Sequence, residues 1–284
     1  MSLFDQKESH RPMVMGILNI TPDSFSDGGE FYRQGSSQLD SVLNKAEQML
    51  KSGADILDVG GESTRPGAVR PSVQEELDRV VPAVEALSQN FQCSISVDTS
   101  RAEVMRQVLD SGAAMINDVR ALTEPGTLEL VAERDTAVCL MHMQGKPLTM
   151  QENPVYRDVV SEVGTFLSAR VEACISAGVS RENICLDPGF GFGKSFEHNM
   201  ELLAGLPQLS ELGLPILVGV SRKGMIGEIT KKPIESRLAG SLAMAQEALY
   251  LGANILRVHD VTETCDMIRI WTAVKNKTAE HKSE

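Results

Sequence analysis

Short apolar segments rich in β-branched residues alternate with longer segments of helical period along the whole chain. Such short apolar runs are typical of parallel strands that are buried on both faces. We expect eight strands, at residues 13–20, 54–60, 93–98, 114–118, 136–142, 183–187, 215–219 and 254–258. The pattern therefore predicts eight consecutive βα units.

The segments between these strands show the spacing of amphipathic helices. Apolar side chains recur on one face at i, i+3 and i+4 in the first two segments, as Leu39, Val42, Leu43, Ala46, Met49 and Leu50 and then as Val73, Leu77, Val80, Val81, Val84 and Leu87. Three pairs resemble capping boxes at helix starts: Ser72 with Glu75, Ser100 with Glu103, and Asp260 with Glu263. Four glycines are expected to end helices: Gly53, Gly112, Gly178 and Gly252.

Eight βα units in a row favour an α/β fold of the (β/α)8-barrel class, as a single domain over residues 1–284. An open doubly wound sheet stays possible, because hydrophobic periodicity does not reveal whether a sheet closes. A short N-terminal segment and the tail from about Lys275 are expected to be disordered. The connections after strands are long at 21–36, 61–71, 143–154 and 221–235, which predicts that this end of the barrel carries the function.

Composition narrows the class of protein further. With 284 residues, 42% hydrophobic and 4% aromatic, the chain can build one large core of aliphatic side chains. A net charge of −12 argues against nucleic acid or an anionic membrane as partner. The five cysteines have no C-x-x-C spacing, and no membrane span or signal peptide is recognisable, so we expect free thiols and a cytoplasmic location.

Polar residues end every predicted strand. They are Asn19, Asp58, Asp98, Asn117 with Asp118, His142, Asp187, Ser221 to Lys223, and Arg257 with His259. A helix cap or a loop hydrogen bond explains any one of them, and we expect such a role for Asp118 and Asp260. A whole ring of polar groups at the end with the long loops predicts an active site, because buried polar groups need partners.

The ring divides by charge into two arcs. Asp98, Asn117 and Asp187 suit the N–H donors of a nitrogen heterocycle. The expected cations suit a phosphate or pyrophosphate with a hard metal ion near Asn19; they are Arg65, Arg222, Lys223, Arg257 and His259. Signatures of serine hydrolases, P-loop proteins and zinc proteases are absent, and the glycines of 189–193 are expected to let the backbone approach a flat ligand.

These residues lie in motifs that resemble those of dihydropteroate synthases. The similar segments are 15–29 (MGILNITPDSFSDGG), 58–67 (DVGGESTRPG), 96–99, 116–118, 141–143, 187–194, 221–223 and 257–260. They follow one another in the family's order and cover the chain from about 13 to 265. The resemblance implies condensation of 6-hydroxymethyl-7,8-dihydropterin diphosphate with p-aminobenzoate, giving 7,8-dihydropteroate and pyrophosphate in folate biosynthesis.

The resemblance also implies a role for each matching residue. Asp98, Asn117, Met141, Asp187 and Lys223 would bind the pterin. Asn19, Arg65, Arg257 and His259 would bind pyrophosphate, and Asn19 would also meet Mg²⁺. The p-aminobenzoate pocket would take Phe25, Thr64, Arg65, Pro66, Phe192, Ser221 and Arg222. Asp98, Lys223, Arg257 and His259 would be catalytic, and the family implies a homodimer that sulfonamides target.

Chemistry and one departure from the family refine these expectations. No dedicated general base is evident, so we expect a dissociative, SN1-like substitution in which the pterin supports a methylene cation. Family members often carry Ser after the Lys of the S-R-K motif, but Gly224 stands here. The carboxylate of p-aminobenzoate would then rely on backbone N–H groups at the start of the following helix, which can bind anions.

Two alternatives use the same pterin contacts. A pterin-dependent methyltransferase would not need a pyrophosphate site, whereas the 21–29 loop and the pairing of Asn19 with Arg257 and His259 predict one. A non-catalytic pterin-binding paralogue should have lost Asp98, Lys223, Arg257 or the first loop, and all are present.

Overall fold

The computed structural model describes residues 3–4, 11–20, 35–63, 69–146 and 148–283. Eight parallel strands form one sheet in the order β6-β5-β4-β3-β2-β1-β8-β7. A bridge between Leu186 and Ile216 joins the two ends of this order, so the sheet closes into a barrel and the open doubly wound alternative is excluded. The strands are β1 Met13–Asn19, β2 Ile56–Gly60, β3 Ser94–Asp98, β4 Met115–Asp118, β5 Ala137–Met141, β6 Ile184–Asp187, β7 Leu217–Val218 and β8 Ile255–Val258.

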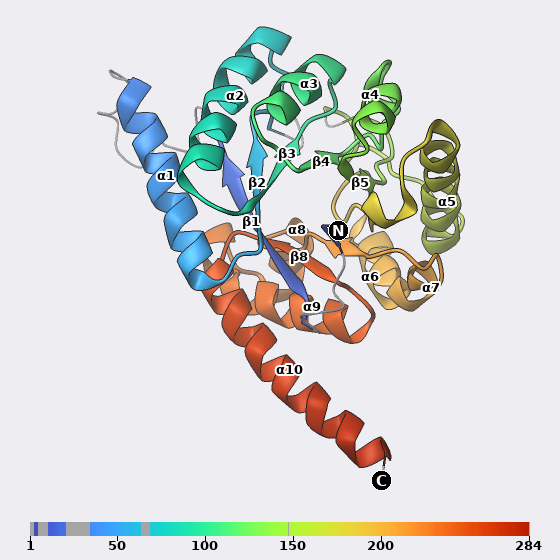
Figure 1. The fold of residues 1–284 in the computed structure, drawn as a ribbon. Coiled ribbons are helices and arrows are strands. Elements are labelled where there is room, and N and C mark those ends of the chain that lie inside the picture. The colour runs from blue at the N-terminus through green and yellow to red at the C-terminus, as the bar shows by residue number, and fades with distance from the viewer. Residues whose placement is uncertain (1–2, 5–10, 21–34, 64–68, 147, 284) are drawn as a thin grey trace.

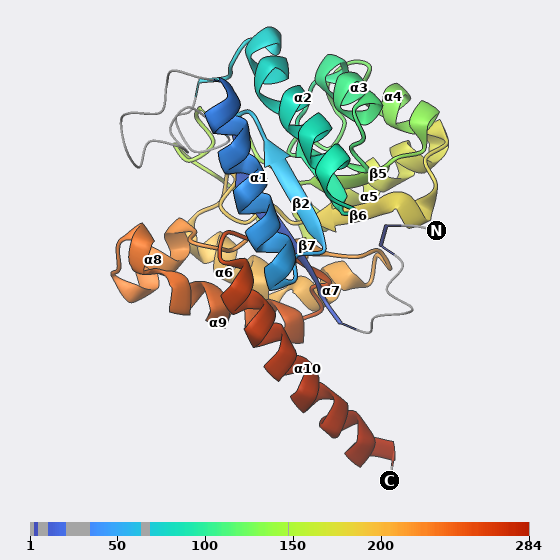
Figure 2. The same ribbon diagram turned by 60° about the vertical axis from the view of Figure 1, so that its left-hand side comes forward.

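Helices surround the barrel, as Figures 1 and 2 show from two sides. They are α1 Gly35–Ser52, α2 Val73–Asn90, α3 Ala102–Asp110, α4 Thr127–Arg134, α5 Val159–Ala177, α6 Phe196–Ala204, α7 Leu206–Ser210, α8 Gly224–Thr230, α9 Leu238–Tyr250 and α10 Val261–Ser283, with short 3-10 turns at Arg181–Asn183 and Ile234–Ser236. The predicted (β/α)8 barrel is therefore confirmed. No described helix is long and apolar enough to cross a membrane.

The period of two along each strand explains where the core and the site lie. Outward residues such as Val14 and Leu18 pack with the helices in the larger apolar cluster. Inward residues near the strand starts form a second cluster inside the barrel, which includes Met15, Ile56, Met115, Cys185 and Ile255. Two residues further along, four of these same strands carry inward polar residues: Asp58, Asn117, Asp187 and Arg257. The barrel interior is thus apolar at one end and polar at the other.

The described part of the N-terminal segment is packed rather than disordered. Phe4 is buried and belongs to the cluster inside the barrel, with Leu3 beside it. This corrects the expectation for the N-terminus at these two residues. The physical reason is that the apolar end of the barrel interior needs a cover, and an aromatic side chain from the N-terminus provides one.

Most predicted helix ends agree with the structure. Ser72 and Glu75 form the expected capping box at α2. Gly53, Gly112, Gly178 and Gly252 all have φ between 107° and 110°, the left-handed region that favours glycine after a helix. The second predicted box is wrong, because α3 begins after Arg101, and the Ser100 hydroxyl hydrogen-bonds Asp118 instead. The Asp260 carboxylate, predicted to cap α10, accepts from Arg222.

Two segments that were expected to lack regular structure contain helices. The segment 221–235 contains α8 and the start of a 3-10 turn rather than an open loop. The tail from Lys275, expected to be disordered, continues α10 to Ser283 and extends away from the barrel (Figures 1 and 2). Helix-favouring Lys and Ala residues and a contact of Lys275 Nζ with the Trp271 ring, 4.5 Å from its centroid, account for this continuation.

Candidate active site

A cavity of about 610 Å³ opens at the carboxyl end of the barrel, where the polar strand ends meet. Its lining includes seven of the residues predicted from the sequence: Asn19, Phe192, Ser221, Arg222, Lys223, Arg257 and His259. Gly224 lies on the same wall. Phe25, Thr64, Arg65 and Pro66 fall outside the described residues. This volume suits small-molecule substrates.

Arg257 extends from the cavity lining into a buried group of polar side chains on neighbouring strands. Its Nε donates to Asp58 Oδ2 at 2.6 Å, and one terminal nitrogen donates to Asp98 Oδ2 at 3.2 Å. The Asn117 amide nitrogen also donates to Asp58 Oδ2, at 3.2 Å. Asp58, Asp98, Asn117 and Arg257 therefore form one hydrogen-bonded cluster, which we call the Arg257 cluster.

The Arg257 cluster changes the predicted division of the ring into two arcs. The sequence placed Arg257 among cations apart from Asp98 and Asn117, whereas the structure joins it directly to Asp98 and, through Asp58, to Asn117. The reason is the closed barrel, in which β8 and β2 both neighbour β1, so the long arginine side chain reaches across β1. Asp58, to which the sequence assigned no specific role, becomes the central acceptor.

Burial and charge set the protonation of the cluster and its neighbours. Burial, opposed by the charge of Arg257 and supported by the nearby Asp58 carboxylate, raises the pKa of Asp98 to about 8. Burial raises the pKa of Asp187 as well, against a hydrogen bond from the Gly189 amide and the charge of Lys223. Burial and the repulsion of Arg257 lower the pKa of Lys223 to about 8. Asp98 and Lys223 can therefore exchange protons near neutral pH, as groups in active sites commonly do.

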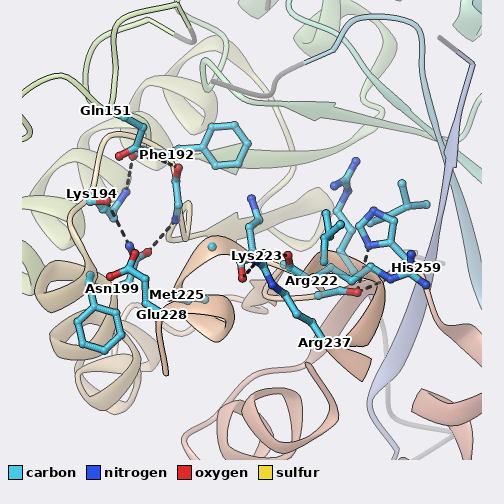
Figure 3. A pocket seen from close by; sticks show the side chains of 18 of the residues that line it. Gln151, Phe192, Lys194, Asn199, Arg222, Lys223, Met225, Glu228, Arg237 and His259 are labelled. Atoms are coloured by element: carbon cyan, nitrogen blue, oxygen red, sulfur yellow. Dashed lines mark hydrogen bonds between the residues drawn. The ribbon is translucent and has the colours of Figure 1, made fainter. Parts of the chain in front are cut away.

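Lys223 and Phe192 face each other across the cavity wall. Lys223 Nζ lies 4.2 Å from the centroid of the Phe192 ring, a cation–π contact (Figure 3). Phe192 sits in the glycine-rich turn that follows β6, and Lys223 precedes α8. The pair brings the sixth and seventh strand ends together.

The glycines of that turn approach the protein's own backbone. A Cβ at Gly189 would lie 1.8 Å from the His142 carbonyl oxygen, and one at Gly193 would lie 2.3 Å from that of Gln144. Both residues also have positive φ. The sequence predicted that these glycines let the backbone approach a flat ligand. At Gly189 and Gly193 the backbone instead approaches the connection that follows β5.

Lys194 is a buried residue that the sequence reasoning did not single out. Its Nζ lies 3.0 Å from His142 Nδ1, and it donates to the carbonyl oxygens of Gly189 at 2.9 Å and Phe192 at 3.2 Å. Burial lowers the pKa of Lys194 to about 7 and, with the charge of Lys194, that of His142 to about 3. The sequence signal that could have identified Lys194 is a lysine directly after G-F-G. Its side-chain amine connects the glycine-rich turn to His142, which follows β5.

His259 is neutral in this environment, although the sequence grouped it with the cations. Burial and the positive charges of Arg257 and Arg222 lower the pKa of His259 to about 4. Its Nδ1 lies 3.1 Å from the Ser221 hydroxyl, and its backbone N–H donates to the same oxygen at 3.3 Å. Ser221 therefore links the seventh and eighth strand ends.

Arg222 adopts φ 60° and points its guanidinium at Asp260. The Ser241 hydroxyl accepts from the Arg222 amide at 2.9 Å, and Arg237 donates to the carbonyl oxygens of Arg222 at 3.1 Å and Lys223 at 3.3 Å. Ser241 in α9 and Arg237 at the N-cap of this helix therefore fix the S-R-K turn. Asp118 likewise has the predicted loop role, since it accepts from the amides of Arg120 and Leu122.

Comparison with known proteins decides the family. The model for "Pterin binding enzyme" matches residues 15–259. Dihydropteroate synthase from Haemophilus influenzae is 52% identical over 265 residues, which cover 93% of this chain and 94% of that protein. This chain belongs to the dihydropteroate synthase family. Solved structures of the family agree in fold.

Two of those structures are complexes with small molecules. The Yersinia pestis dihydropteroate synthase, described with a sulfonamide drug complex, has a TM-score of 0.88 and 51% identity, covering 94% of this chain and 95% of that one. The Xanthomonas albilineans dihydropteroate synthase, in complex with 7,8-dihydropteroate, has a TM-score of 0.85 and 44% identity, covering 97% and 95%.

The sequence resemblance predicts a hard metal ion, Mg²⁺, at Asn19. Among the described residues, no cluster of three or more His, Cys, Asp or Glu side chains could hold a metal on its own. Asn19 offers one amide oxygen on the cavity wall that Arg257 and His259 also line. That set fits Mg²⁺, which keeps several waters and takes few protein ligands besides substrate phosphates.

Proposed function

We propose that this chain condenses 6-hydroxymethyl-7,8-dihydropterin diphosphate with p-aminobenzoate to give 7,8-dihydropteroate and pyrophosphate. The observation that carries the proposal is the Arg257 cluster, which puts buried carboxylates and an amide next to a cavity with Asn19, Lys223 and His259 on its wall. Such a site has acceptors for a heterocycle beside a cavity whose wall carries donors for an anionic leaving group.

The pterin would bind at the buried end of the site. Asp98, Asn117 and Asp187 supply acceptors for its ring and amino N–H groups, and Lys223 supplies a donor for its carbonyl. Met141, buried at the end of β5, would pack on the ring face. Their burial excludes water, which strengthens each of these hydrogen bonds.

The diphosphate would lie toward Asn19, Arg257 and His259, with Arg65 from the second loop. A neutral His259 donates one N–H to an anion, and an arriving diphosphate would favour its protonation, because opposite charge raises the pKa of an imidazole. Mg²⁺ held by Asn19 would stabilise negative charge on the leaving group.

The p-aminobenzoate would enter between Phe192 and the S-R-K turn, with Ser221, Arg222 and the loop residues Phe25, Thr64, Arg65 and Pro66 around it. The Arg222 guanidinium forms an ion pair with Asp260. At Gly224, a Cβ would have nothing within 4 Å. We therefore expect the carboxylate to lie near Gly224, where the space is open.

The substitution would run in a dissociative manner. The methylene C–O bond breaks, pyrophosphate leaves with the electron pair, and the arylamine nitrogen then bonds to the methylene carbon and loses one proton. Arg257 and His259 stabilise the leaving charge, while Asp98 favours the cationic pterin, because positive charge nearby shifts this carboxyl group toward its ionised form. Release of pyrophosphate from the pterin substrate alone, on prolonged incubation, is expected.

We also propose that the functional unit is a homodimer, as the family resemblance implies. Size-exclusion chromatography with light scattering tests this directly, and a monomer mass at micromolar concentration would contradict it.

A coupled assay for pyrophosphate release tests the reaction. We expect release that requires the pterin diphosphate and Mg²⁺, rises strongly with p-aminobenzoate, and is inhibited competitively by a sulfonamide. A methyltransferase or a binding-only paralogue would bind pterin without releasing pyrophosphate, which would overturn the proposal.

A further inference from the structure

Asn117 has one buried atom without a partner. Its amide nitrogen donates to Asp58 Oδ2 at 3.2 Å, whereas its Oδ1 has no hydrogen-bond partner among the described residues. A buried acceptor without a partner is costly. Asn117 lies next to the cavity, because the Asp58 oxygen to which it donates also accepts from Arg257 on the cavity wall. The orientation of this amide therefore decides whether the site presents an acceptor or a donor.

Asp58 controls that orientation. Its side chain is completely buried on β2, and its Oδ2 also accepts from Arg257 Nε at 2.6 Å. A carboxylate paired with a guanidinium can only accept hydrogen bonds. The Asn117 amide must therefore turn its nitrogen toward Asp58 and keep Oδ1 for another donor.

We propose that Asp58 is a positioning residue that fixes the Asn117 amide so that Oδ1 accepts from an N–H group of the pterin. The inference rests on the proposed function, since it names how one of its pterin contacts is oriented. A pterin offers N–H donors at its ring and amino nitrogens, so the opposite orientation would set donor against donor. Asp58 itself does not touch the substrate.

The competing explanation is that Asp58 serves only as the counter-ion of Arg257. Two substitutions separate these roles. Asp58→Asn removes the charge but keeps an oxygen that can accept from both Arg257 and Asn117. Asp58→Ala removes the charge and the acceptor, which frees the Asn117 amide to rotate.

The experiment measures binding of free 6-hydroxymethylpterin by calorimetry, because this ligand lacks the diphosphate. We expect binding about tenfold weaker for Asp58→Ala and for Asn117→Ala, the equivalent of one lost hydrogen bond, and within about threefold of the unsubstituted protein for Asp58→Asn. Asp58→Ala with Asn117→Ala should bind no more weakly than either single variant, because both remove the same contact.

Ser96→Ala is the matched control. Ser96 lies beside Asp58 in register, is equally buried, and its Oγ has no partner among the described residues. Its substitution should leave pterin binding unchanged. If Asp58→Ala does not fold, as judged by thermal unfolding, Asp58→Ser tests the same loss with a smaller cavity.

The outcomes are distinct. An Asp58→Asn variant as weak as Asp58→Ala, or additive losses in the double variant, would overturn the positioning role and leave the proposed function standing. Normal binding by Asn117→Ala would overturn both this inference and the pterin role of Asn117. A protein that binds no pterin at all would overturn the proposed function itself.

Discussion

Asp187 shows how one side chain is prepared for a ligand before the ligand arrives. Its Oδ1 accepts from the Gly189 amide at 2.7 Å, which fixes the carboxylate at the end of β6. Burial raises its pKa, while the Gly189 hydrogen bond and the charges of Lys223, Arg257 and Lys194 act in the opposite direction. A fixed carboxylate among cations is a directed acceptor, so ordering it costs little when a pterin binds.

Replacing Asp187 with Ala should abolish measurable pterin binding while the protein stays folded. The variant removes two acceptor atoms but leaves the apolar end of the barrel interior intact. Calorimetry with 6-hydroxymethylpterin and a thermal unfolding curve check the two parts. Normal pterin affinity would refute the role assigned to Asp187.

Sequence predicted the polar residues at this scale but not how they pair. Asp98, Asn117, Asp187 and Lys223 could be named because they end strands and lie in family motifs. The hydrogen bond between Asp58 and Arg257 joins residues 199 positions apart, and no local sequence pattern predicts it. Protonation was also out of reach, since the neutral state of His259 depends on its burial.

The glycine-rich turn is the element that connects the sixth strand with the rest of the site. Lys194 holds it from inside by bonds to the carbonyl oxygens of Gly189 and Phe192. Asn199 on α6 holds it from outside, where its Oδ1 accepts from the Gly191 amide at 2.7 Å. Phe192 is therefore presented to Lys223 by a turn with little freedom.

Substituting Gly189 with Ala should destabilise the protein by more than about 3 kcal/mol, because the new Cβ would combine positive φ with a backbone collision. Gly178→Ala is the matched control, with φ 107° but nothing within 4 Å of its Cβ. It should cost about 1–2 kcal/mol. Urea denaturation measures both, and equal losses would show that φ alone limits Gly189.

Element type was more predictable than element detail. Apolar runs and helical spacing were sufficient for eight strands and the surrounding helices. The helix expected after Gly224 is α8, but periodicity could not give its bounds, because its seven residues are too short to show a period. The sequence pattern also assigned Ser100 to a helix cap, since the competing bond to Asp118 comes from another strand.

Barrel closure makes the site a property of the whole molecule. Arg257 near the end of the chain pairs with Asp58 and Asp98 near its start, across 199 and 159 positions. Sequence could predict that eight strand ends form a ring, because each βα unit places its strand in parallel. It could not predict which side chains would reach across it.

Replacing Arg257 with Ala should weaken binding of the diphosphate substrate more than binding of free 6-hydroxymethylpterin. We expect about a tenfold to hundredfold loss for the former, the range of one charge-assisted hydrogen bond, and a smaller loss for the latter through the disturbed cluster. Binding of both ligands to the same variant checks this. Equal losses would contradict the pyrophosphate assignment.

Asp98 links the site to the stability of the fold. Burial raises its pKa from the ordinary value of 3.8 to about 8 in spite of Arg257. A carboxyl group that holds its proton more tightly in the folded than in the unfolded chain lowers stability progressively as the pH rises between these values.

Asp98→Asn cannot titrate and should therefore gain stability relative to the unsubstituted protein as the pH rises from 4 to 8, while its activity falls. Urea denaturation at several pH values measures the difference, from which the titration of all other groups largely cancels. A stability difference that stays constant across this range would mean that Asp98 is already ionised at low pH, held so by Arg257.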